Sequence, residues 1–125
     1  MIQQTPKSGE QSPNTVESGG KEVAVGDWVR DAEGDDSKML VVECFDIPAD
    51  EFGILQTQST VAEENPGYPA DDPVVKVVFY EGLNYYLDGW SVEEVLDKAV
   101  RANGKLGDTR ISAYSYPLSR VTPIQ

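Results

Sequence analysis

The run VVKVVFYE at residues 74 to 81 is the feature that most constrains the fold. Successive side chains of a β-strand point to opposite faces, so this run places apolar side chains on both faces of one strand. A strand of this kind is buried on both sides, which predicts a central rather than an edge position in a sheet. The first expectation is therefore an all-β or α+β domain.

A hairpin is predicted before this strand. The pattern of residues 23 to 30 predicts a strand that the chain enters through a Gly-Asp turn. A second apolar run follows at residues 38 to 46. The seven charged or small residues between them fit a hairpin loop. In the second run we expect Glu43 to face water, which places Val42 and Cys44 inward.

One helix and a final strand follow the central strand. Ser91 is a plausible N-cap, and Glu94 stands three residues later, as in a capping box. The Asn-Gly stop that comes next predicts a helix over about residues 91 to 103. The last strand is predicted over residues 111 to 116.

The first part of the chain has a different composition. Residues 1 to 22 consist mainly of Ser, Gly, Gln, Pro and Glu, with Ile2 and Val16 as the branched aliphatic residues. Such a segment buries too little apolar surface to offset the entropy lost on ordering. We therefore expect a disordered tail over residues 1 to 22 and a single domain over residues 23 to 125.

Short motifs resemble a known fold. GDWVR at residues 26 to 30, followed by a charged loop and MLVV at 39 to 42, resembles the opening hairpin of small SH3-like barrels, in particular a bacterial family of the Gly-Asp-x-Val and Met-x-Val type. VVFY at 77 to 80 and YSYPLSRV at 114 to 121 are similar to its third strand and its ending. The resemblance implies a mainly β (α+β) domain: an SH3-like barrel of about five strands, with insertions at 47 to 73 and at the helix.

The charge of the chain is regional. The net charge is −12, and residues 23 to 72 carry thirteen acidic and two basic residues, whereas residues 73 to 125 carry six of each. Carboxylates keep a protein hydrated in concentrated salt, so the first hypothesis is that the protein is adapted to high salt. The run YPADDP at 68 to 73 also resembles acidic haloarchaeal proteins of unassigned function. The competing hypothesis is an acidic face that meets a basic partner or imitates DNA phosphates. The predicted acidic surface consists of Asp31, Glu33, Asp35, Asp36, Glu63, Glu64, Asp71 and Asp72.

Several chemistries are disfavoured by composition. The chain has no histidine, which removes the commonest general base and the commonest transition-metal ligand. The lone Cys44 lies in an apolar run, where a structural role is the expectation. We predict a protein that is not an enzyme and that has no cofactor or metal site. Without a signal-like or membrane-spanning apolar stretch, a cytoplasmic location is expected.

Aromatic residues are the candidate binding site. Trp28 is expected on the opposite strand face from the buried Val29 and therefore partly exposed. With Tyr80, Tyr114 and Tyr116 it is predicted to form a strip of the kind that binds extended, proline-rich peptides. The alternative is that these rings pack under the helix or the inserted loop.

Two function classes follow. The first is a binding or adaptor module that contacts a protein partner, not yet identified, through the aromatic strip. The second is a nucleic-acid-linked protein, either an acidic DNA mimic or a small barrel that binds nucleic acid when high salt screens its charge. The tyrosines at 85 and 86 and Trp90 are expected to pack around the start of the helix.

Overall fold

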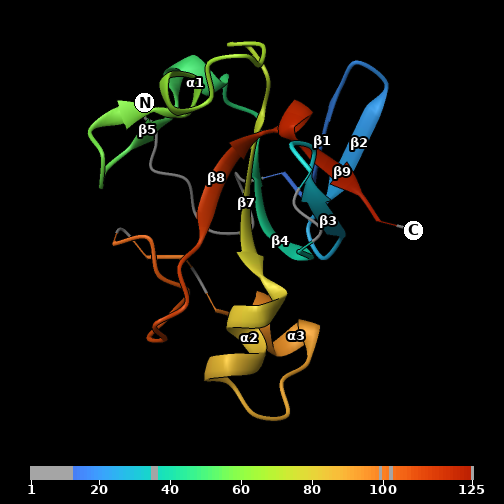
Figure 1. Cartoon of the computed structure of the whole chain (residues 1–125), viewed down its shortest axis with the longest axis vertical. Coiled ribbons are helices and arrows are strands. Elements are labelled where there is room, and N and C mark those ends of the chain that lie inside the picture. Colours follow the sequence, from blue (N-terminus) through green and yellow to red (C-terminus); the bar gives the residue numbers. More distant parts are fainter. Residues whose placement is uncertain (1–12, 35–36, 99, 102, 125) are drawn as a thin grey trace.

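A five-stranded antiparallel sheet forms the centre of the protein (Figure 1). The computed structural model describes residues 13–34, 37–98, 100–101 and 103–124. The strands lie in the order β8-β7-β4-β3-β9. Their bounds are Trp28–Asp31 (β3), Met39–Phe45 (β4), Val74–Phe79 (β7), Tyr114–Pro117 (β8) and Val121–Pro123 (β9). The mainly β fold class and the central position of the strand that begins at Val74 are confirmed.

Both faces of the central β4–β7 pair are covered. In the register of this pair Val41 lies opposite Val77 and Leu40 opposite Val78, so alternate pairs point to alternate faces. One face carries the hairpin-side cluster and the other the helix-side cluster. The hairpin-side cluster contains Val16, Val23, Val29, Met39, Val41, Cys44, Val75, Val77, Leu118 and Val121. The helix-side cluster contains Leu40, Val42, Val78, Leu83, Val95, Leu106 and Ile111.

A β-bulge in β4 changes which side chains face the same way. The register with β7 shifts between Val41 and Glu43. As a result Cys44 joins the hairpin-side cluster, whereas Val42 belongs to the helix-side cluster. The prediction that Val42 and Cys44 share an inward face is therefore wrong. Glu43 is also only partly exposed, because it lies opposite Lys76 on a covered face.

The two edges of the sheet are joined by one continuous segment. β8 pairs with β7 and β9 pairs with β3, and between them lies only the 3-10 turn η2 (Leu118–Arg120). Neighbouring strands in the chain thus occupy opposite edges (Figure 1). In the part of the chain that the structure describes, β8 and β9 do not pair, so the sheet is open rather than a closed barrel.

An N-terminal hairpin covers one face of the sheet. β1 (Thr15–Ser18) and β2 (Lys21–Ala24) pair across Gly19 and Gly20, whose φ angles of 60° and 84° suit a tight hairpin turn. Val16 and Val23 are buried in the hairpin-side cluster. The predicted disordered tail over residues 1–22 is therefore wrong for residues 13 to 22, and residues 1–12 lie outside the described part.

Two short helices cover the other face, where one longer helix was predicted. α2 (Tyr80–Tyr86) follows β7 directly, and α3 (Val92–Leu96) has the predicted Ser91–Glu94 capping box. The prediction of a helix extending to residue 103 is wrong, because Val100 instead forms a β-bridge with Leu106. Both helices lie together at one end of the sheet (Figure 1). No helix in the described ranges is long and apolar enough to cross a membrane.

The segment from 47 to 73 is a small folded insertion rather than a plain loop. It contains η1 (Ala49–Glu51), the paired strands β5 (Gly53–Ile54) and β6 (Ser59–Thr60), and α1 (Val61–Glu64). Thr60 and Glu63 form a capping box at the start of α1. Val61 and Ala49 are buried with Val74, so the insertion has its own apolar cluster.

A buried carboxylate connects the hairpin, the insertion and η2. Asp72 is 1% exposed. Its side chain accepts hydrogen bonds from the Ser119 backbone N–H at 2.7 Å and from the Ser18 hydroxyl at 3.3 Å. A buried N–H that loses its acceptor destabilises the folded state, so Asp72 holds three elements in place.

We therefore expect Asp72→Ala to lower the free energy of unfolding by about 1–3 kcal/mol, the typical effect of leaving a buried donor without a partner. The neighbouring Asp71 is exposed, so Asp71→Ala is the matched control and should change stability by less than about 0.5 kcal/mol. Urea unfolding followed by circular dichroism measures both. Equal stability of the two variants would contradict the role given to Asp72.

Candidate functional site

The predicted aromatic strip is divided between the two faces of the sheet. Trp28 lies opposite Leu40 and packs with the helix-side cluster, and Tyr80, the first residue of α2, packs against Trp28. Tyr114 and Tyr116 lie opposite Val77 and Val75, on the hairpin side. The two-residue period of strands separates them, so the four aromatic side chains do not form one continuous surface.

Trp28 and Tyr80 belong to an aromatic triad with Trp90. The ring centroids of Trp28 and Tyr80 are 5.8 Å apart, those of Tyr80 and Trp90 5.9 Å, and those of Trp28 and Trp90 6.3 Å. All three side chains are partly buried. The prediction that Trp28 is partly exposed is confirmed. Lys38 lies on this triad, with its Nζ 4.4 Å from the Tyr80 ring centroid.

Tyr114 forms part of a different site, which we call the tyrosine pocket. Its ring packs on Phe79 at 5.4 Å, with an angle of 32° between the ring planes. Together with Tyr86 from α2 and Arg110 these rings surround a pocket of about 250 Å³. The complete lining is Phe79, Glu81, Gly82, Tyr86, Arg110, Ile111, Ser112 and Tyr114.

Tyrosine side chains around this pocket are unusually exposed. Tyr114 is 45% exposed and Tyr86 48%, and the adjacent Tyr85 is 81% exposed. Tyr85 packs edge-on against Tyr86 at 4.8 Å and does not line the pocket. The expectation that the tyrosines at 85 and 86 pack is therefore wrong for Tyr85 and holds only in part for Tyr86, about half of which is exposed. Tyrosine and arginine are the residue types enriched at the centres of protein interfaces.

Tyr116 does not contribute to either site. It packs against the hairpin-side cluster, and the Arg120 guanidinium lies over its ring at 4.6 Å. This contact stabilises the junction of β8 and η2.

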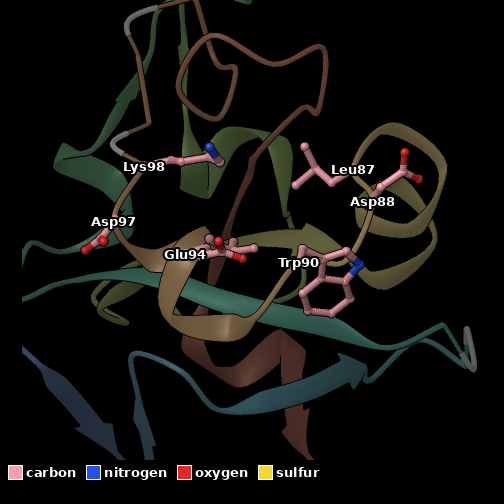
Figure 2. A pocket seen from close by; sticks show the side chains of 7 residues that line it. Leu87, Asp88, Trp90, Glu94, Asp97 and Lys98 are labelled. Carbon is pink, nitrogen blue, oxygen red and sulfur yellow. The ribbon is translucent and has the colours of Figure 1, made fainter.

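A second pocket, of about 450 Å³, lies beside Trp90. Figure 2 shows Leu87 and Lys98 pointing toward one another from opposite sides, while the carboxylates of Asp88 and Asp97 point away from the centre. Glu94 also lines the pocket, but its carboxylate accepts hydrogen bonds from Ser91 in the capping box. The charged groups do not converge on one point, so this pocket is a weaker candidate than the tyrosine pocket.

The predicted acidic surface is partly used inside the fold. Arg120 donates two hydrogen bonds to Asp31, at 2.9 and 3.1 Å, and forms an ion pair with Glu33 at 3.4 Å. Its remaining nitrogen donates to the buried Asn65 side chain at 2.7 Å. Hydrogen bonds from Arg120 and from a backbone N–H lower the pKa of Asp31, although partial burial opposes this shift.

The other acidic residues have varied environments. Glu63 belongs to the α1 capping box, and Glu64 accepts a hydrogen bond from Ser59 at 2.7 Å. Asp71 is exposed, whereas Asp72 is buried. The prediction of a solvated carboxylate at Asp72 is therefore wrong. The two remaining members, Asp35 and Asp36, lie outside the described residues.

Cys44 and the charged pair of Glu43 and Lys76 are candidate reactive groups. Burial raises the pKa of the Cys44 thiol to about 12, so it is protonated at neutral pH. Burial also raises the pKa of Glu43 and lowers the pKa of Lys76, and the attraction between the two opposes both shifts. None of these three side chains lines the pocket beside Trp90 or the tyrosine pocket. The described residues contain no group of three potential metal ligands.

The lowered pKa of Asp31 predicts that the stability of the protein depends on pH. A carboxyl whose pKa is lower in the folded state adds stability above its unfolded pKa of about 3.9, and loses it as the pH falls through the folded value. We expect Asp31→Asn to reduce the free energy of unfolding at pH 7. The difference from the wild type should shrink as the pH falls below about 4.

Urea unfolding at a series of pH values measures this difference. The exposed Asp46 supplies the control, because Asp46→Asn should have little effect at any pH. A difference between wild type and Asp31→Asn that does not change with pH would refute the pairing with Arg120.

Comparison with known proteins gives no relative for this chain. It matches no protein-family model, no curated protein and no solved structure. The function must therefore be inferred from the geometry of its surface.

Proposed function

We propose that the protein is a non-enzymatic binding module that holds an extended, proline-containing segment of a protein partner in the tyrosine pocket. The observation that carries the proposal is the half-exposure of Tyr86 and Tyr114 on a pocket that Phe79 also lines. A domain of this size ordinarily uses its aromatic rings to cover the core. Exposed apolar patches bounded by polar groups instead mark interaction sites.

The size of the pocket favours a peptide. Its volume of about 250 Å³ lies below the ~300–1,000 Å³ of most small-molecule sites. One or two side chains of a partner fill such a volume, while the rest of the segment lies across the surface. Tyr85 comes from the same helix, α2, and packs against Tyr86. It extends the aromatic surface beyond the pocket.

The chemistry of the lining favours a proline-rich segment. A polyproline II helix has no internal hydrogen bonds, so its carbonyl oxygens are free to accept. The hydroxyls of Tyr86 and Tyr114 and the guanidinium of Arg110 are donors at the pocket. Proline rings pack on aromatic rings, and the segment loses little entropy because it is already extended.

We also propose that the sheet is a partly open SH3-like barrel. Residues 114–123 form both edge strands of the five-stranded sheet, β8 and β9. A turn of three residues joins these two strands. A sheet whose edge strands are linked so tightly must curl toward closure. This arrangement, together with the GDWVR and MLVV motifs, supports the proposal.

The alternative of an acidic DNA mimic has less support. Such a role needs rows of free carboxylates on the surface. Asp31 and Asp72 are instead engaged by Arg120 and Ser119, and Glu63 and Glu64 make local hydrogen bonds. An enzymatic role has no support from the tyrosine pocket, whose lining offers one carboxylate and no thiol.

The test is titration with a proline-rich decapeptide containing Pro-x-x-Pro, followed by amide chemical shifts in NMR spectra. We expect the shifts to concentrate at residues 79–86 and 110–114. Tyr86→Ala and Tyr114→Ala should each weaken binding by about tenfold or more, as for the central residues of an interface. Tyr85→Ala is the matched control and should weaken it by less than about threefold.

Binding that is unaffected by Tyr86→Ala and Tyr114→Ala would refute the site. Shifts that concentrate elsewhere on the protein would refute it too.

A further inference from the structure

The aromatic triad has a geometry suited to a positive charge. Trp28 comes from β3, Tyr80 from the start of α2 and Trp90 from the segment between α2 and α3. The planes of Trp28 and Tyr80 meet at 73°, and those of Tyr80 and Trp90 at 74°. Rings at such angles form a corner in which one cation contacts the negative faces of two rings at once.

A cation already occupies this corner. The Lys38 Nζ lies 4.4 Å from the Tyr80 ring centroid and 5.2 Å from the Trp28 ring centroid, both within the range of cation–π attraction. The Tyr80 N–H donates to the Lys38 carbonyl at 2.9 Å, which continues the β4–β7 ladder and places the two residues side by side. Among the described residues, no carboxylate forms an ion pair with Lys38.

The part of the chain that carries the triad is rich in negative charge. The chain as a whole has 22 acidic and 10 basic residues. Residues 80–97, which include two rings of the triad, carry five acidic residues and no basic one. This local excess of negative charge attracts cations to the triad.

The Lys38 side chain is also easily displaced. The residue is exposed, and its ammonium is carried on a flexible four-carbon stem. A cation that is less strongly hydrated than a primary ammonium gains more from the ring faces, because it loses less hydration on leaving water. Methylated ammonium groups are of this kind.

We propose that the Trp28–Tyr80–Trp90 triad is a binding site for an ammonium group, with methylated forms preferred, and that Lys38 is its resident competitor. The site is distinct from the tyrosine pocket, because the two share no residue. It adds a second specificity to the surface rather than depending on the proline-rich ligand.

The fluorescence of the protein reports on this site directly. Both tryptophans of the chain belong to the triad. We would titrate tetramethylammonium chloride at constant ionic strength, with KCl as the replaced salt. Lys38→Ala should give a saturable fluorescence change and bind about fivefold more tightly than the wild type, the factor for one exposed cation–π contact.

Two variants make the test specific. Lys38→Arg keeps a cation over the rings and, because a guanidinium is less strongly hydrated than an ammonium, should bind tetramethylammonium no more tightly than the wild type. Lys38→Ala with Tyr80→Leu removes one ring face, keeps an apolar side chain and should abolish the saturable change. Urea unfolding of each variant shows that the domain is folded.

Peptides identify the source of the ammonium. Short peptides containing lysine or trimethyl-lysine would be titrated into Lys38→Ala. Binding of a peptide assigns the site to a protein side chain, whereas binding of tetramethylammonium alone assigns it to a small solute, and either supports the proposal. A linear, unsaturable response of Lys38→Ala to every probe would overturn it and leave Lys38 as a cover for packed rings.

Discussion

The need to cover both faces of the β4–β7 pair governs the rest of this structure. A strand that is apolar on both sides is stable only when water is excluded from both, since each buried CH₂ contributes roughly 0.8 kcal/mol. The chain meets this need with unequal layers. A two-stranded hairpin covers one face, and two short helices with Leu106, Ile111 and Ala113 cover the other. The insertion buries the far end of β7 at Val74.

The unequal covering of the two faces of the sheet explains where the binding sites can lie. The covering helices are short, so their aromatic side chains are not all enclosed by neighbours. Tyr86 and Tyr114 remain at the margin of α2, and Trp28, Tyr80 and Trp90 meet where three elements join. The polar contacts of Arg120 and Asp72, by contrast, hold η2 to β3, the insertion and the hairpin. The residues of the proposed binding surfaces are thus different from the residues whose polar contacts hold the elements together.

Local patterns predicted the elements whose signals are local. The β3–β4 hairpin, the central strand and the Ser91 capping box follow from alternation and short-range hydrogen bonding, and all three are observed. The end of the helix was not predictable from its apolar stripe, because the bridge between Val100 and Leu106 is a tertiary contact.

Other features depend on partners distant in sequence. Val16 appears as an isolated aliphatic residue in a polar segment and becomes a core residue only when the hairpin docks on the sheet. The Gly19-Gly20 pair between alternating runs was a signal for that hairpin. The bulge after Val41 moved Cys44 to the opposite face, and the strand period divided the aromatic strip. Trp90, Tyr86 and Arg110 joined the sites through the placement of α2 and the final loops, which no local pattern specifies.

Native-state hydrogen exchange tests the central claim that both faces of the sheet are covered. The account predicts that the β4 and β7 amides exchange only through global unfolding, and that the paired amides of residues 15–24 and of α2 are also protected. Rapid, unprotected exchange throughout residues 15–24, with β4 and β7 still protected, would contradict it, because the hairpin side would then lack its cover.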